Sequence, residues 1–372
     1  MFKTRFNNLL SIAVISYLIT ACGSSSNQNN SSTVGKVVDD YIAGAMVCAD
    51  VNNNGLADDG VENCVETDSQ GNFRFSTIRS ESLVMSGGID IGTGQPFRGT
   101  LSAPPGSTVV NPLTTLIHSV QNEGNITSEK AQEIVKNQLG LNNTNVDLTT
   151  FDPLSELQFG EDTATKEVAQ QVLAQQTTVQ VVLSVTATTI SATSENIEER
   201  EVSVEASNQM ARLILTPTDN NPTKISSRET IKTIIEETAQ ETFSGNTEED
   251  TDALASIEAV QDVVAQQIQV VAQTVSTNIQ SVQVNNSEQS SLDIIEESNA
   301  AILLVTDTQS EDSVTNIIEE AVTTGETQTL ANVNINSEID NSQDNLIERP
   351  EIVEQIKEDI EIKVTGGEGG TL

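Results

Sequence analysis

A long run of apolar residues at helical spacing constrains the fold of this chain more than any other feature. Its members recur at steps of three and four residues, which places them on one face of an α-helix. They are Leu254, Ile257, Val260, Val264, Ile268, Val271, Val275, Ile279 and Val282. Because the stripe is narrow and close to a heptad repeat, we expect it to pack against another helix, of this chain or of a partner.

Helical signals extend over the whole acidic segment from residue 161 to residue 365. An earlier apolar face runs from Val168 to Val182, but Gln175 and Thr186 occupy positions where such a face needs apolar side chains. The many Thr, Val and Ile residues lower the helix propensity of the segment. We therefore expect a mainly helical region with partial disorder.

The first part of the chain has a different pattern. Between residues 35 and 105, short apolar or alternating runs are separated by clusters of Gly, Asn and Asp, as β-strands are. Phe73 and Phe75 are two residues apart and therefore point to one face of a strand. Six of the seven aromatic residues after Cys22 lie before residue 160, so we expect the well-packed core in this part of the chain.

Residues 106–160 predict a small helical extension between these two parts. Its helices should begin at polar residues that can accept a hydrogen bond from the first helical turn. A capping box formed with Glu229 should start a helix in the acidic region in the same way. The predicted N-terminal caps are Asn111, Ser128, Asp152 and Ser226.

These patterns predict an α+β chain. A small N-terminal β-sandwich-like module should be followed by an acidic, mainly helical region. The expected segments are a signal peptide at 1–21, a flexible tether at 22–34, the β module at 35–105, the helical extension at 106–160, the acidic helical region at 161–365 and a disordered tail at 366–372.

The N-terminal segment is typical of an export signal. Lys3 and Arg5 precede an apolar run from Leu9 to Ile19, which is too short to cross a bilayer core of about 30 Å as a helix. The run ends in Leu-Ile-Thr-Ala-Cys-Gly, which resembles the lipobox of bacterial lipoproteins and implies that Cys22 receives lipid. An ordinary secretory peptide with a chance cysteine is the alternative.

The lipobox resemblance implies a location. Gly23 follows the cysteine in place of the Asp that tends to retain lipoproteins in the inner membrane. The expected location is therefore the outer membrane, with the protein on its periplasmic or its exterior face. In such an oxidising compartment, Cys48 and Cys64 are expected to form a disulfide.

The charge of the chain limits its partners. The formal net charge is −38, and residues 161–372 contain 39 acidic and 9 basic residues. A field of this sign repels nucleic acids and anionic lipids. Nucleic-acid binding is therefore excluded, and cations are the natural small partners.

The segment inside the expected disulfide has the pattern of a calcium loop. Asp50, Asn52 and Asn54 supply side-chain oxygens at alternate positions, and Gly55 permits a sharp turn. Calcium binds about six to eight oxygens, and EF-hand loops wrap around it with this spacing. The segment contains four acidic and no basic residues, so we expect bound Ca²⁺. The other candidate ligands are the Leu56 carbonyl and the side chains of Asp58, Asp59 and Glu62.

Two observations set limits on this interpretation. The EF-hand places a bidentate Glu at the twelfth loop position, which is Val61 here, and Glu62 comes one residue later. The flanking sequence is also not helical. The alternative is an Asn-Gly turn between two strands, with solvated acidic side chains.

Three glycine- and Asp/Asn-rich motifs carry a resemblance to known modules. They are Tyr41-Ile42-Ala43-Gly44-Ala45, Asp50-x-Asn52-x-Asn54-Gly55 and Thr67-Asp68-x-x-Gly71-Asn72-Phe73. Together they resemble calcium-binding β-sandwich modules of bacterial surface proteins, namely serine-aspartate-repeat B-type and carboxypeptidase-regulatory-like domains. The segment from Gly87 to Leu116 is similar to the continuation in exported adhesin-like proteins. The resemblance covers about residues 35–160 and implies a structural or adhesive role.

The sequence does not predict an enzyme. His118 is the only histidine and lies beside an apolar face, and no nucleophile elbow or phosphate loop is present. The first hypothesis is a surface lipoprotein whose calcium-stabilised module binds a protein or a glycan. The second is an envelope assembly partner that associates, with itself or others, through the long apolar stripe near residues 251–283. The third is a carboxylate-dependent hydrolase, which no motif selects.

Overall fold

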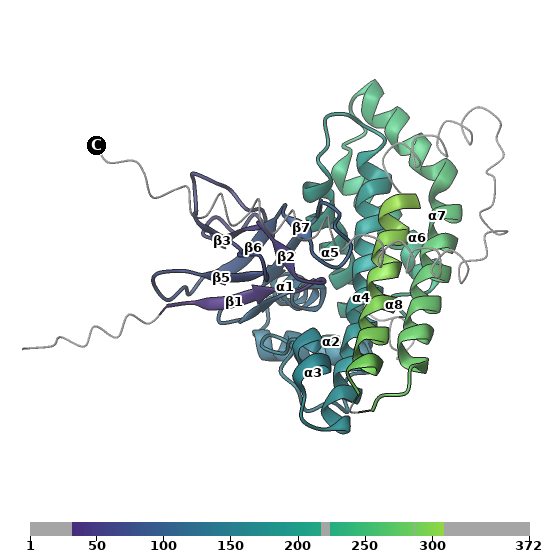
Figure 1. Cartoon of the computed structure of the whole chain (residues 1–372). Helices are drawn as coiled ribbons and strands as arrows, with labels where there is room; N and C mark the ends of the chain where they lie inside the picture. The colour runs from purple at the N-terminus through teal and green to yellow at the C-terminus, as the bar shows by residue number, and fades with distance from the viewer. Residues whose placement is uncertain (1–31, 217–223, 286, 309–372) are drawn as a thin grey trace, which may run out of the picture.

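The computed structural model describes residues 32–216, 224–285 and 287–308. In this part of the chain a small β-sheet region is followed by a mainly helical region, as the sequence predicts (Figure 1). The strands form one side of the molecule and the long helices α4, α6, α7 and α8 form the other. The expected signal peptide, the lipidation site Cys22, most of the tether and the expected disordered tail lie outside the described residues.

The strands of the β region form three small sheets. One has the order β5-β1-β9, in which β1 pairs antiparallel with β5 and parallel with β9. The others are the pair β2-β7 and the antiparallel sheet β4-β3-β6-β8. The strands are β1 (Val34–Val37), β2 (Ile42–Ala43), β3 (Met46–Asp50), β4 (Asn63–Glu66), β5 (Asn72–Arg74), β6 (Ser82–Ser86), β7 (Ile89–Asp90), β8 (Thr100–Ala103) and β9 (Val109–Val110). Phe73 and Phe75 are both buried in one cluster of this region, as their spacing predicts.

The helices begin at residue 112. They are α1 (Pro112–Gly124), α2 (Ser128–Gln138), α3 (Pro153–Phe159), α4 (Thr163–Ser191), α5 (Glu199–Leu215), α6 (Arg228–Thr242), α7 (Glu248–Ser281) and α8 (Glu288–Thr308). Asn111 and Asp152 cap α1 and α3, as predicted. The other two predicted caps are wrong by one residue, because Thr127 caps α2 and Ser227 caps α6. The hydroxyl group of Ser227 accepts from the Thr230 N–H, so the box between Ser226 and Glu229 does not form.

The apolar face of α7 is buried inside this chain. Ile257, Val264 and Ile268 are each at most 2 % exposed, and α7 packs against α4, α6 and α8. The predicted long helix is therefore confirmed, and its partners are helices of the same chain.

The largest hydrophobic core lies among the helices and not in the β region. It consists mainly of Val, Ile, Leu and Ala side chains from α1 to α8, and it also contains Val38 and Val109 from the β region. The expectation of a core confined to the aromatic-rich first part is therefore wrong, and Phe159 is 76 % exposed. Several helices around α4 bury long stripes of small aliphatic side chains, and among the buried members of this core in the described residues only Phe243 is aromatic.

Helix α4 is central and is buried on nearly all sides. It packs against α3, α5, α7 and α8. Three of its buried hydroxyl groups are satisfied within the helix, since Thr177, Thr178 and Thr189 each donate to the carbonyl four residues earlier. The buried hydroxyl group of Thr186 has no hydrogen-bond partner among the described residues. No helix among the described residues is long and apolar enough to cross a membrane.

Candidate calcium loop

The candidate calcium loop, residues 50–62, connects β3 and β4. These strands pair antiparallel with Cys48 opposite Cys64, and the two cysteines form the predicted disulfide at the base of the loop. Asn53 and Gly55 have φ angles of 56° and 76°, in the left-handed region that folds the chain back sharply. The loop thus has two fixed ends and a tight turn between them.

Asp50 is the most buried of the candidate ligands, with 2 % of its surface exposed. Its Oδ2 atom accepts a hydrogen bond of 3.1 Å from the Gly55 N–H. Its Oδ1 atom is buried and has no hydrogen-bond partner among the described residues. Burial raises the pKa of this carboxyl group, and the hydrogen bond from Gly55 opposes that effect.

The side chains of Asn52, Asn54 and Asp58 converge on one another. Both amide Nδ2 atoms donate to Oδ2 of Asp58, over 3.0 Å from Asn52 and 2.9 Å from Asn54. These hydrogen bonds lower the pKa of the Asp58 carboxyl group. The amide oxygens of Asn52 and Asn54 accept from the N–H groups of Asn54 and Leu56. Three predicted ligands are therefore within contact distance before any ion is considered.

Glu62 closes the loop from its far end. Its Oε1 atom accepts from the Val51 N–H over 2.8 Å, and its Oε2 atom accepts from the Asp58 N–H over 3.3 Å. The one-residue offset from the EF-hand position therefore does not prevent this carboxylate from reaching the loop. Asp59 is exposed and makes no side-chain hydrogen bond with a described residue, so the structure leaves it outside the network.

The residue types present fit calcium better than a transition metal. Among the described residues, no three His, Cys, Asp or Glu side chains are grouped so that they alone could hold a metal ion. A bound ion would therefore need amide, carbonyl or water oxygens as well, which calcium accepts and zinc or copper sites do not favour. The unpartnered Asp50 Oδ1 is the atom that such an ion would satisfy.

Behind the loop lies a polar cavity that the sequence does not predict. It measures about 200 Å³ and is lined by Asp50, His118 of α1, Ser207 of α5 and other polar residues. The two ring nitrogens of His118 are 3.0 Å from Ser102 Oγ and 3.1 Å from Asn122 Nδ2. Burial lowers the pKa of His118 to about 4, so the ring is neutral near pH 7. The sequence does not predict the cavity because its walls come from separate segments between residue 50 and residue 208.

Compared with models of known protein families, with curated proteins and with solved structures, the chain matches none of them.

Proposed function

We propose that the chain is an outer-membrane lipoprotein whose β region is stabilised by one Ca²⁺ in the loop at residues 50–62. The lipid on Cys22 tethers it, and the folded part binds a protein or a glycan at the cell envelope. This function has no catalytic step. Incorporation of labelled palmitate into the wild-type protein, and not into a Cys22→Ser variant, tests the anchor.

One observation supports the calcium site above all others. Asp50 Oδ1 is a buried carboxylate oxygen without a partner in the part of the chain that the structure describes, and an unsatisfied buried polar atom costs about 1–3 kcal/mol. The same loop offers further side-chain oxygens, which belong to Asn52, Asn54, Asp58 and Glu62. When bound, calcium supplies positive charge that these groups otherwise lack.

The assembly hypothesis has less support than the binding hypothesis. It depended on an apolar helical stripe that needs a partner, but α4, α6 and α8 already cover that stripe. The acidic surface remains, and it favours cationic or neutral partners over anionic ones.

The calcium affinity of two matched variants tests the proposed function. Asp50→Asn removes the charge of the buried carboxylate, whereas Asp59→Asn makes the same chemical change at an exposed position outside the network. Titration calorimetry of the oxidised full chain should show at least tenfold weaker calcium binding at this loop for Asp50→Asn and no change for Asp59→Asn. Equal affinities in both variants and the wild type would refute the loop as the binding site.

A further inference from the structure

Three aspartates are buried together where the β region meets the helices. Asp39 and Asp40 connect β1 to β2, and Asp90 ends β7, which pairs with β2. Their exposed fractions are 2 %, 9 % and 3 %. Burial raises the pKa of Asp40 to about 7 and also raises the pKa values of Asp39 and Asp90. The negative charge of Asp90 adds to this effect on Asp39 and on Asp40.

Two of the three carboxylates are fully engaged by neighbours. Asp90 accepts at Oδ2 from the Asp40 N–H over 3.1 Å, and at Oδ1 from the N–H and hydroxyl groups of Thr93 over 2.7 and 2.8 Å. Asp40 accepts at Oδ1 from the Tyr41 N–H over 2.7 Å and at Oδ2 from the side chain of Asn299 over 2.9 Å. These bonds fix the two groups in place.

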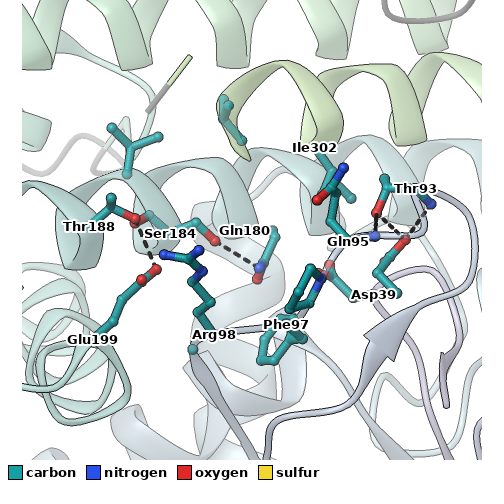
Figure 2. A pocket seen from close by; sticks show the side chains of 15 residues that line it. Asp39, Thr93, Gln95, Phe97, Arg98, Gln180, Ser184, Thr188, Glu199 and Ile302 are labelled. Atoms are coloured by element: carbon teal, nitrogen blue, oxygen red, sulfur yellow. Dashed lines mark hydrogen bonds between the residues drawn. The ribbon is translucent and has the colours of Figure 1, made fainter. Parts of the chain in front are cut away.

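Asp39 has no such partners. Both of its carboxylate oxygens are buried, and neither has a hydrogen-bond partner among the described residues. Asp39 lines a cavity of about 60 Å³ together with Asp90, Thr93 and Gln95. Figure 2 shows Asp39 beside Thr93, Gln95 and Phe97 at one end of this cavity, with Arg98 and Glu199 at the other.

Without a donor near either oxygen, burial favours the neutral form of Asp39 when no cation is bound. A bound cation is the alternative that would keep this carboxylate charged. The other unpartnered buried atom beside this segment is also an acceptor. It is Oε1 of Gln176, whose Nε2 atom donates to the carbonyls of Val38 and Asp39. A bound cation would supply a partner for these acceptor atoms.

Among the described residues, no positive group is a main source of charge at Asp39. The charges that act on Asp39 are those of Asp90 and Asp40, which are negative. Arg98 lines the same cavity, but its side chain is exposed. A cavity of this size has room for an ion with a small number of water molecules, since one water needs only about 10–15 Å³.

We propose that this cavity binds a single hard metal cation, with calcium as the first candidate, through Asp39 and neutral oxygens. Asp40 and Asp90 provide negative charge around the site. The neutral oxygens are required because three acidic side chains do not converge on one point in the described structure.

The position of this site gives it a structural role. Gln176 belongs to α4 and Asn299 to α8, and both donate to the Asp39–Asp40 segment. An ion bound at Asp39 would hold the β region against these two helices. The site is separate from the loop at residues 50–62, so the two can be tested independently.

Calcium stoichiometry by equilibrium dialysis tests the proposal on the oxidised full chain. The wild type and the control Asp59→Asn should bind two ions, Asp39→Asn and Asp50→Asn one each, and the double variant none. A single ion in the wild type that is lost with Asp50→Asn would overturn the inference and leave the proposed function intact. A single ion that is lost only with Asp39→Asn would support this inference and overturn the calcium loop of the proposed function. A wild type that binds no calcium would overturn both proposals.

Terbium luminescence locates the second ion even if Asp39→Asn does not fold. Tyr41 lies two residues from Asp39, the chain contains no Trp, and its only other Tyr is Tyr17 in the expected signal peptide. Terbium bound at Asp39 should therefore emit after excitation of tyrosine, in the wild type and in Asp50→Asn. The emission should be lost in Tyr41→Phe and displaced by calcium. Absence of tyrosine-sensitised emission from Asp50→Asn would overturn the proposal.

Discussion

At the scale of single residues, buried carboxylate oxygens without partners mark the two candidate sites. Among the described residues, Asp50 has one such oxygen and Asp39 has two, whereas most buried carboxylates in folded proteins are paired. His118 is the contrasting case, since both of its ring nitrogens are within hydrogen-bond distance of a neighbour. Its ring is part of the packing, and it behaves as a neutral group.

The burial of His118 predicts a pH dependence of stability. Its pKa is about 4 in the folded protein and about 6.5 in the unfolded chain, so the unfolded chain binds the additional proton first as the pH falls. The neutral ring therefore contributes its full share to the free energy of unfolding above about pH 6.5. This contribution, about 3 kcal/mol in total, is lost as the pH falls towards 4.

Urea unfolding at pH 7.5 and pH 4.5 measures this effect as the difference in the free energy of unfolding between the wild type and His118→Gln. The wild type should lose more stability than His118→Gln at pH 4.5. The acidic residues Asp50 and Glu123 line the same cavity as His118, and both are present in the wild type and in the variant. The pKa values of Asp39, Asp40 and Asp90 are raised, so these groups make the protein more stable as the pH falls through part of the same range. Their effect is the same in the wild type and in His118→Gln and cancels in the comparison. A stability difference that does not change with pH would contradict the assignment.

At the scale of elements, apolar spacing predicts α7 but does not predict the position of α4. The stripe on α7 faces α4, α6 and α8 and leaves the opposite side in solvent, which is the arrangement that a periodic pattern indicates. Helix α4 is buried on nearly all sides although Thr and Gln interrupt its apolar face. Its backbone carbonyls accept hydrogen bonds from the hydroxyl groups of Thr177, Thr178 and Thr189, which therefore tolerate burial. Hydropathy alone cannot show this.

The α7 stripe predicts a sharp contrast between two neighbouring positions. Ile268 is 1 % exposed and Val270 is 40 % exposed on the same helix. Ile268→Asp should lower the free energy of unfolding by about 3–5 kcal/mol, since it removes a packed side chain and buries a charge. Val270→Asp should cost much less. Sedimentation should show the same molecular mass for the wild type and Val270→Asp, and equal stability losses in the two variants would contradict the intrachain packing.

The two candidate sites differ in how far the sequence predicts them. Alternate oxygen-bearing residues and Gly55 lie within one short segment, so their spacing predicts the loop, including the approach of Glu62. The cavity beside Asp39 depends on the pairing of β2 with β7, which brings Asp40 to Asp90 across 50 residues, and on α4 and α8. Contacts of this kind arise only from the tertiary fold. In the sequence, Asp39, Asp40 and Asp90 do not differ from the many other acidic residues of the chain.

At the scale of the whole molecule, the β region and the helices form a continuous structure. Val38 and Val109 join the helical core, and Gly55 of the loop lies against Val204 of α5. A fragment that ends near residue 160 would expose this contact surface, so the full chain is the appropriate sample. With a net charge of −38, bound cations would reduce the repulsion among the acidic side chains of the entire fold.

The most direct test of the calcium claim is the melting temperature of the oxidised wild-type chain, measured by calorimetry in calcium, in magnesium and in EDTA. Calcium at a hundredfold excess over its dissociation constant should stabilise the fold by about 2.7 kcal/mol for each site. Magnesium should have a much smaller effect, because it demands a tighter octahedral shell. The Cys48–Cys64 disulfide must be intact in every sample, since it stabilises the same loop. A higher melting temperature in calcium than in EDTA is predicted, and identical melting curves in the three buffers would contradict the account.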